Sequence, residues 1–486
     1  MEDYFEGSTA IVGAGFAGLA AANRLASKGV AVTVYDMGSR GPGGRASFRE
    51  VPLKDGGFMQ FDHGCQFIMA SNPLVAVQIR EWELKRFLRE WTGRFGLLDA
   101  STGIYTDRTA MHAPQRPSGT TSQGPKSLKK RLSGVLGLLK KGSGKSAAPE
   151  LSKGGAEGEG HTDGQTGQLG VCGILGQGRV YVGSSCMVDA CSAMYQQIGI
   201  QVKWGEQASS VTGHCFHMLG VKQATHHSES GWELTVETRR KDKYTRQHRN
   251  LILADQMNVR PGSHGYVNLG EHDSCVLSQR VQTVKRCPRY SLMIAIKRGV
   301  IQAPFDGATI ANSEVIEWLS NDSSKPGRER DDDLECWVAV ATEAYARSLI
   351  AEMPLFKKDG QYVPQTDAVL SDIANRIWDA VKGLLKPFSE GEVPQPVYLR
   401  AQRWASAYKA ELIEEPCVTD LSLDLGACGD FCGKSSTAEG AILSGLAAAD
   451  SIAAHALEQA KAMQAKSTAT NGMPSPFDRA IMPSAR

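Results

Sequence analysis

Three glycines near the N-terminus have the spacing of a turn that cradles a pyrophosphate. They lie in "TAIVGAGFAGLAAANRL", between a short apolar run and an alanine-rich stretch that starts near Phe16. Gly15 lets the backbone approach the phosphates, and Gly18 lets a helix pack closely on a strand. We therefore predict a strand, a tight turn and a helix whose positive end holds a dinucleotide. The binding residues predicted from this segment are Gly13, Ala14, Gly15, Phe16, Ala17 and Gly18.

An acidic residue follows where such a site needs one. The apolar run "VAVTVYD" ends at Asp36, which is 18 residues after Gly18. A carboxylate at the end of this second strand accepts hydrogen bonds from the adenosine ribose. Strand, helix and acid together make the glycine motif specific, although they do not separate NAD from FAD.

The segment "GPGGR", a few residues after this acid, favours FAD. Gly44 gives the backbone room beside a cofactor, and Arg45 supplies a permanent positive charge to phosphate or flavin. Dehydrogenases that use NAD have no general need for such an arm. The alternative is a surface turn with a solvated arginine.

Composition narrows the class of protein around this motif. The chain has 486 residues, more than one hydrophobic core normally supports, so we expect two domains. A formal net charge of +2 gives no electrostatic case for nucleic acid. The 11 cysteines are scattered without metal-ligand spacing, so we predict no metal site and a reducing compartment. No uninterrupted apolar run is long enough to cross a bilayer, so we expect no integral membrane segment.

The elements that must position these residues are visible in the hydrophobic pattern. The stretch "LVAVQIREWELKRFLREW", residues 74–91, looks helical, as do the segments around residues 365–385 and 440–460. Short strand-like runs include "GRVYVGSS", "GIQVKW", "WELTVETR", "RNLILAD", "SLMIAIKR", "EVIEWLSN" and "CWVAVATE". Residues 115–170 are rich in Gly, Ser, Thr, Lys and Glu, so we interpret them as a disordered insertion. Within it, residues 127–142 have a basic amphipathic pattern suited to a membrane surface or a partner, or they form a solvated linker.

Seven segments together resemble one family. In chain order they are "AIVGAGFAGLAAANRLASKG", "YDMGSRGPGGRASFR", "FDHGCQF", "VGSSCMVDACSAM", "WLSNDSSKPGR", "AQRWASAY" and "GDFCGKSSTAEGAILSGLAAADSI". The chain resembles the renalase-like FAD/NAD(P)-binding oxidoreductases, a branch of the flavin amine oxidase group. The chain departs from the family at "GKSSTAEGA", at "LILADQMNVRPG" and in the long insertion.

The resemblance implies an α/β fold of the amine oxidase and p-hydroxybenzoate hydroxylase type, with a Rossmann-type FAD-binding domain and an inserted mixed-sheet substrate domain. We assign residues 1–76, 171–262 and 405–462 to the FAD-binding domain, and 77–114 and 263–404 to the substrate domain. Residues 463–486 form a flexible tail. The compartment expected is the cytoplasm, or a plastid if a longer N-terminus exists.

The resemblance also implies further cofactor-binding residues. Backbone near Ala208 would approach the adenine, and the "DHG" turn would lie beside the isoalloxazine. Asp430 would bind the ribityl chain, and the start of a helix near residue 440 would face the flavin pyrimidine edge, where it stabilises negative charge. The residues added in this way are Asp62, His63, Gly64, Ala208, Gly429, Asp430, Gly440 and Ala441.

The function expected is that of an FAD-dependent oxidoreductase with non-covalent FAD. By resemblance, a dihydronicotinamide dinucleotide, NAD(P)H or an isomer of it, donates a hydride, and oxygen or another acceptor reoxidises the flavin. The first alternative is a flavin amine oxidase, and the second is a flavin-retaining scaffold that acts through residues 115–170. Hydride transfer needs no protein acid or base, so catalytic residues stay unassigned, as does the oligomeric state.

Three features stay open at this point. His63 either takes part in proton transfer or shapes the turn, and Trp404 either faces the substrate or belongs to the core. The loop "SSKPGR", residues 323–328, either contacts a substrate phosphate through Lys325 and Arg328 or is neutralised by the nearby "DDDLE" run.

Overall fold

The computed structural model describes residues 8–38, 41–54, 56–109, 178–197, 201–204, 213–217, 219–238, 240–354, 363 and 365–471. The predicted insertion 115–170 and Ala208 lie outside the described residues. The expectations for them therefore stay predictions.

A mostly parallel sheet contains the glycine motif. Its strand order is β20-β21-β14-β1-β2-β10-β9, and all its pairs are parallel except β20 with β21. Every residue of β1 and β14 is buried, as expected for central parallel strands. The strands are β1 (Thr9–Val12), β2 (Val32–Asp36), β9 (Gln201–Trp204), β10 (Gly213–His217), β14 (Asn250–Leu253), β20 (Val418–Asp420) and β21 (Leu425–Ala427).

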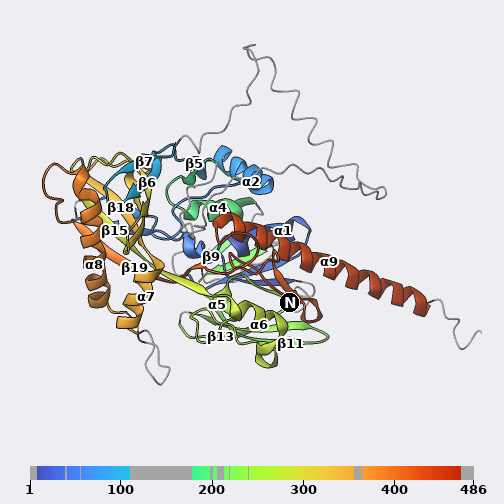
Figure 1. Cartoon of the computed structure of the whole chain (residues 1–486). Coiled ribbons are helices and arrows are strands. Elements are labelled where there is room, and N and C mark those ends of the chain that lie inside the picture. Colours follow the sequence, from blue (N-terminus) through green and yellow to red (C-terminus); the bar gives the residue numbers. More distant parts are fainter. Residues whose placement is uncertain are drawn as a thin grey trace, which may run out of the picture. The chain divides into compact units, whose positions relative to one another are not determined.

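Small residues let two helices approach closely beside this sheet. α1 (Phe16–Ser27) and α9 (Ala438–Asn471) cross where a Cβ on Gly445 would lie 2.1 Å from the Ala17 carbonyl oxygen. α4 (Val188–Gln197) contributes to the same core, and Figure 1 shows α4, α1 and α9 together. Alanine and glycine at the crossing thus fix the start of α9 close to the glycine motif.

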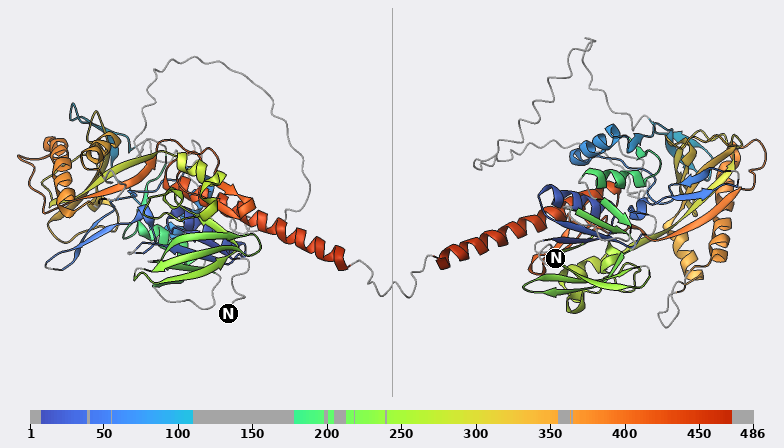
Figure 2. Two further views of the ribbon diagram at one scale, coloured as in Figure 1. Left: turned by 90° about the horizontal axis from the view of Figure 1, so that it is seen from below. Right: turned by 180° about the vertical axis from the view of Figure 1, so that it is seen from behind.

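A second, mixed sheet carries its own core. Its order is β19-β15-β18-β17-β16-β6-β7, antiparallel except for β16 with β6. α7 (Glu343–Glu352) and α8 (Asp367–Leu385) cover one face, as Figures 1 and 2 show, and β4 packs on the other. The strands are β6 (Phe95–Asp99), β7 (Tyr105–Asp107), β15 (Arg286–Lys297), β16 (Gly307–Ala311), β17 (Ile316–Asn321), β18 (Leu334–Ala341) and β19 (Tyr398–Lys409).

Smaller elements complete the described chain. The hairpin of β3 (Arg49–Pro52) and β4 (Phe58–Phe61) follows the arginine arm. β11 (Leu219–His227), β12 (Gly231–Thr238) and β13 (Lys243–His248) form an antiparallel sheet. The short helices α5 (Gln256–Val259) and α6 (Val276–Thr283) lie after β14.

The helix predicted over residues 74–91 is wrong in its second half. α2 spans Pro73–Leu84, and β5 (Leu88–Glu90) then pairs with β8 (Tyr181–Gly183). Arg86 has a φ of 64°, a left-handed conformation that turns the chain out of the helix. Tertiary pairing with β8 therefore overrides the local helical pattern.

α9 bears on two expectations about the C-terminal region. It continues through Asn471, so the predicted tail is helical at its start. Over Ala438–Gln459 it is long and apolar enough to cross a bilayer, but Ala448, Ala449 and Ile452 are buried in the protein core. A core helix passes the same test of length and composition, so the expected absence of a membrane segment stays a prediction.

The fold class expected from the sequence is confirmed. The chain combines a Rossmann-like parallel sheet, built from separated stretches, with a mixed second sheet. The domain boundaries remain predictions.

Candidate functional site

The glycine turn between β1 and α1 has one packed glycine and one open glycine. Gly13 has a φ of +110°, which favours glycine, and a Cβ on Gly18 would lie 1.9 Å from the Gly13 carbonyl oxygen. A Cβ on Gly15 would meet no protein atom within 4 Å. The turn therefore needs Gly18 for its own packing, whereas the space over Gly15 is left clear by the protein.

Asp36 at the end of β2 lies against this turn. Its Oδ2 accepts a hydrogen bond from the Ala14 amide at 3.3 Å, and its Oδ1 accepts one from the Gly38 amide at 2.8 Å. Burial raises the pKa of the carboxyl, and these two backbone donors oppose that effect. A buried acid at the edge of a clear space is suited to accept hydroxyl donors from a sugar.

The arginine arm is attached to the turn by backbone contacts. The Gly43 amide donates to the Ala14 carbonyl at 2.9 Å, and a Cβ on Gly44 would lie 3.6 Å from Gly15 Cα. Gly44 thus backs Gly15 at ordinary contact distance. The structure brings the two predicted segments into one cradle.

Arg45 pairs with a carboxylate 385 positions away. Its Nη1 and Nη2 donate to Asp430 Oδ2 and Oδ1 at 2.5 and 2.7 Å. Nη1 also donates to the Ala407 carbonyl, and Nη2 lies 3.5 Å from Asp255. Burial opposes the charge of Arg45, but the carboxylates outweigh this and raise its pKa. The sequence predicted separate cofactor contacts for Arg45 and Asp430, and the structure makes them one bidentate pair.

Lys409 on β19 joins this pair and was not foreseen. Its Nζ lies 3.5 Å from Asp430 Oδ1 and donates to Ser406 Oγ at 2.8 Å. The side chain is fully buried, and burial lowers the pKa of Lys409 against the opposing effect of Asp430. For Asp430, burial would raise the pKa, but Arg45 and Lys409 lower it. The carboxylate therefore stays charged between two cations.

The "DHG" turn packs directly on the arm. The Cys65 amide donates to the Arg45 carbonyl at 2.8 Å, and a Cβ on Gly64 would lie 2.1 Å from that oxygen. His63 stacks on Trp404, with ring centroids 5.3 Å apart, and Trp404 Nε1 donates to the His63 carbonyl at 2.9 Å. Both residues hold the turn against β19, which favours a shaping role for His63.

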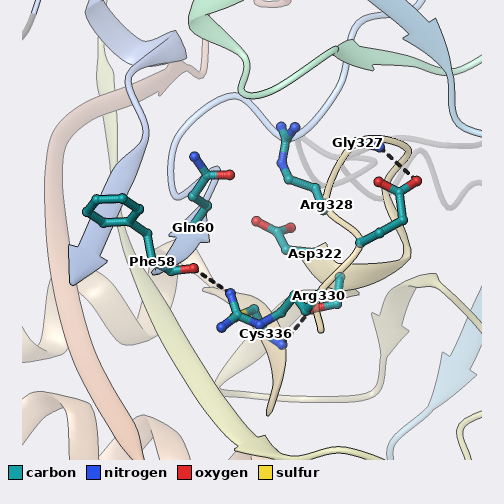
Figure 3. A pocket seen from close by; sticks show the side chains of 9 residues that line it. Phe58, Gln60, Asp322, Gly327, Arg328, Arg330 and Cys336 are labelled. Carbon is teal, nitrogen blue, oxygen red and sulfur yellow. Dashed lines mark hydrogen bonds between the residues drawn. The ribbon is translucent and has the colours of Figure 1, made fainter. Parts of the chain in front are cut away.

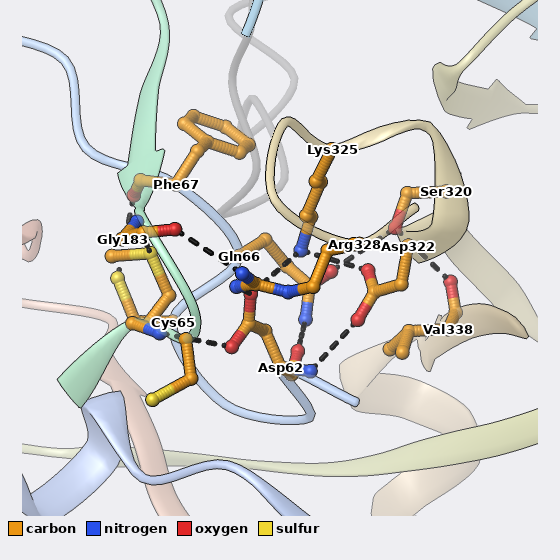
Figure 4. Close-up of polar contacts among 12 residues, drawn as sticks. Asp62, Cys65, Gln66, Phe67, Gly183, Ser320, Asp322, Lys325, Arg328 and Val338 are labelled. Carbon is orange, nitrogen blue, oxygen red and sulfur yellow. Dashed lines mark hydrogen bonds and ion pairs between the residues drawn. The ribbon is translucent and has the colours of Figure 1, made fainter. Parts of the chain in front are cut away.

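The side chain of Asp62 belongs to a buried cluster of charged residues (Figure 4). Its Oδ2 lies 3.2 Å from Lys325 Nζ and 2.9 Å from Arg328 Nη2. Lys325 also lies 2.7 Å from Asp322, whose Oδ2 accepts from the Asp62 amide at 2.7 Å. Burial would raise the pKa of Asp62, but Arg328 and Lys325 lower it to about 2. We call these four residues, Asp62, Asp322, Lys325 and Arg328, the Asp62 cluster.

This cluster answers the open question of the "SSKPGR" loop. Lys325 and Arg328 are neutralised, but by Asp62 and Asp322 rather than by the "DDDLE" run. A cleft of about 70 Å³ opens beside Arg328 and Asp322, and Figure 3 shows Arg330 donating to the Phe58 carbonyl at its edge. The arginines of this cleft have protein acceptors, so it does not present a free positive charge to a phosphate.

The start of α9 is held by side chains on both sides. The Gly440 amide donates to Thr437 Oγ1 at 3.1 Å, and the Gly429 amide donates to Ser444 Oγ at 3.0 Å. Glu439 accepts from the Ser71 and Asn72 amides at the start of α2. Gly440 and Ala441 are thus in the first turn of α9, with Asp430 in the loop before it.

Comparisons with known proteins agree with the fold. Residues 11–80 match the model of the NAD(P)-binding Rossmann-like domain. The chain is similar to the cyclohexylamine oxidase of Brevibacterium oxydans IH-35A, with a TM-score of 0.56 and 13% identity over 93% of this chain and 99% of that one. It is also similar to a putrescine oxidase double mutant made to redesign cofactor binding, with a TM-score of 0.50 and 15% identity over 92% and 99% of the two chains. The chain therefore has the fold of these oxidases.

Proposed function

We propose that this protein is an FAD-dependent oxidoreductase that accepts a hydride from a small reduced substrate. The substrate class that we favour is a dihydronicotinamide dinucleotide, with oxygen or another acceptor for reoxidation. The similarity of fold to two amine oxidases supports the flavoenzyme class.

One observation carries the cofactor assignment. Gly15 leaves clear space in the turn, and Asp36 and the Gly43–Arg45 arm border that turn. The backbone amides of the turn, at the positive end of α1, would hold the pyrophosphate, and Asp36 would accept from the adenosine ribose. The residues present thus fit FAD, and the extended arm is more than a nicotinamide cofactor alone requires.

The chain's own residues would bind, orient and shield the reacting groups. FAD supplies the hydride acceptor when it is bound. The Arg45–Asp430 pair would hold the chain of the cofactor beside β19, and the positive end of α9 would face the ring system. Trp404 and His63 would form a wall that excludes water. No protein acid or base is needed for transfer of a hydride between aligned partners.

The cysteines near Asp430 support non-covalent attachment. Cys428 and Cys432 are fully buried among apolar side chains. Burial raises the pKa of Cys432 to about 12 and that of Cys428 well above its ordinary value. Both thiols therefore stay protonated and are poor nucleophiles.

Oxidation of a primary or secondary amine is the second candidate. It is favoured by the fold shared with putrescine oxidase and cyclohexylamine oxidase. The carboxylate of Glu317 on β17, which is largely shielded from solvent, already pairs with Arg289 of β15 at 2.8 Å. A positively charged amine would have to compete with Arg289 for the Glu317 carboxylate, so we rank amine oxidation second.

Anaerobic reduction of the bound flavin tests the proposal. Purified holoprotein is mixed with dihydronicotinamide dinucleotides and their isomers, and separately with amines, while the visible flavin absorbance is followed. We expect rapid bleaching by at least one dihydronicotinamide. Bleaching by amines alone would establish the second candidate instead.

A further inference from the structure

Four arginines from separate segments gather where β15 begins. Arg286 is the first residue of β15, and its carbonyl accepts from Arg347 Nη2 at 2.8 Å. Arg286 Nη1 lies 3.6 Å from Met257 Sδ, and Arg260 Nη1 donates to the Gln282 carbonyl at 3.4 Å. We call Arg260, Arg286, Arg347 and Arg403 the arginine cluster.

Two members of this cluster, Arg260 and Arg286, have no carboxylate partner among the described residues. Within the residues that the structure describes, no carboxylate oxygen lies within 4.0 Å of the Arg260 or Arg286 guanidinium, whereas Arg347 pairs with Glu343 at 2.6 Å. Burial, followed by repulsion from Arg260, Arg403 and Arg347, lowers the pKa of Arg286. Gathering partly buried like charges is unfavourable unless an anion joins them.

Three other buried or partly buried arginines of the described chain each pair with a carboxylate. Arg45, Arg289 and Arg328 each have a carboxylate within 3 Å. The half-buried guanidinium of Arg286 instead contacts the sulfur of Met257. Within the described residues, the missing carboxylate at this position therefore points to an anionic ligand.

The cluster lies beside the predicted cofactor site. Arg286 is opposite Lys409 in the β15–β19 ladder, and opposed residues of antiparallel strands share a face. Lys409 reaches Asp430, which binds Arg45. On the other side, Met257 follows Asp255, which also contacts Arg45. A ligand on the arginine cluster would thus be a short step from the flavin.

We propose that the arginine cluster binds the phosphate groups of the hydride-donating substrate. This inference rests on the proposed function and names the group that the protein recognises. A pyrophosphate carries two negative charges and many acceptor oxygens, so it matches several guanidinium groups better than a single carboxylate does. The cluster is therefore a specificity site for dinucleotides over phosphate-free dihydronicotinamides.

Calorimetric titration of the oxidised holoenzyme tests this site without turnover. The probes are NAD⁺, ADP-ribose and nicotinamide riboside, which lacks phosphate. Arg286→Gln and Arg260→Gln are compared with Arg246→Gln, an arginine on β13 that lies over Tyr244. We expect each cluster variant to weaken NAD⁺ and ADP-ribose binding about tenfold or more, because a hydrogen bond between charged groups is lost. Binding of nicotinamide riboside and FAD content should not change in any variant. The Arg246→Gln control should bind NAD⁺ and ADP-ribose as the wild type does.

Three outcomes would overturn the inference. The first is that both cluster variants bind NAD⁺ as tightly as the wild type does. The second is that the wild type binds nicotinamide riboside as tightly as it binds the phosphate-bearing probes. The third is that the cluster variants lose FAD, which would assign the arginines to the cofactor. If dihydronicotinamides do not bleach the flavin, the proposed identity of the hydride donor is wrong. Phosphate-dependent binding lost in Arg286→Gln would still support the site.

Discussion

The Asp62 cluster and the arginine cluster treat buried charge in opposite ways. In the first, two cations and two carboxylates pair with one another inside the protein. In the second, arginines approach each other, and Arg260 and Arg286 have no carboxylate within 4.0 Å in the described part of the chain. Both lie close to the "DHG" turn or the Arg45–Asp430 pair, so location alone does not explain the difference.

We interpret the Asp62 cluster as structural and the arginine cluster as a ligand-binding site. Charges that the protein closes on itself fix the "DHG" turn to the loop after β17, and they have nothing left to offer a ligand. Among the described residues, Arg260 and Arg286 have no carboxylate partner, so under our proposal an anionic ligand would stabilise them. The same distinction appears at the glycine turn, where Gly18 is packed and Gly15 is clear.

The largest effect on stability is expected from removing one carboxylate of the Asp62 cluster. Asp62→Asn should lower the free energy of unfolding by about 3–5 kcal/mol, because Lys325 and Arg328 would remain buried with too little negative charge. Urea unfolding measures this. Glu352→Gln, which breaks the exposed pair with Arg376, is the control and should change stability by less than about 1 kcal/mol. Equal effects of the two variants would show that the Asp62 cluster is not closed as described.

The two glycines of the turn extend the comparison. Gly18→Ala should destabilise the fold by about 1–3 kcal/mol, since its Cβ would collide with the Gly13 carbonyl. Gly15→Ala should leave stability almost unchanged and weaken FAD binding by roughly tenfold or more, or about 1.4 kcal/mol. Thermal unfolding and flavin retention on gel filtration measure the two effects. A Gly15→Ala protein with wild-type FAD affinity would contradict the cradle.

A smaller effect concerns pH. The folded pKa of Asp62 is about 2, below its unfolded value of about 3.9, so its contribution is present above the unfolded pKa and is lost as pH falls. The stability advantage of the wild type over Asp62→Asn should shrink by about 1 kcal/mol between pH 5 and pH 3. The raised pKa of Asp322 acts in the opposite direction in both proteins. An advantage that grows on acidification would contradict the pairing of Asp62.

The smallest effect on stability is expected from a substitution in the arginine cluster. In the absence of ligand, Arg286→Gln should leave the free energy of unfolding unchanged or raise it by less than about 1 kcal/mol, because a repelled cation is removed. Urea unfolding against Arg246→Gln as control checks this. A loss of several kcal/mol would mean that Arg286 is structurally paired after all.

Local sequence pattern was sufficient for the parts of the site that are contiguous. The strand, turn, helix and acid from Thr9 to Asp36 need only short-range rules, and the arm follows directly. The family resemblance placed the "DHG" turn beside the isoalloxazine and the arm along the cofactor, and both contacts stay predictions. The Cys65 to Arg45 hydrogen bond, which joins these two segments, was not predicted.

Pairings between distant side chains were beyond those rules. Nothing near Arg45 indicates Asp430, and nothing near Asp62 indicates Lys325 or Arg328. The charges of "SSKPGR" were visible, but Asp62, the partner that Lys325 and Arg328 share, lies more than 260 residues earlier in the chain. The arginine cluster likewise forms only when α5, β15 and α7 meet, so no single segment could reveal it.

The central claim is that this chain binds FAD and receives a hydride from a dihydronicotinamide. The most direct measurement is the anaerobic absorbance titration of purified holoprotein with dihydronicotinamide dinucleotides. We predict that the visible absorbance of the flavin falls in proportion to the dihydronicotinamide dinucleotide added, until one equivalent has reacted. A colourless protein that does not take up added FAD would contradict it.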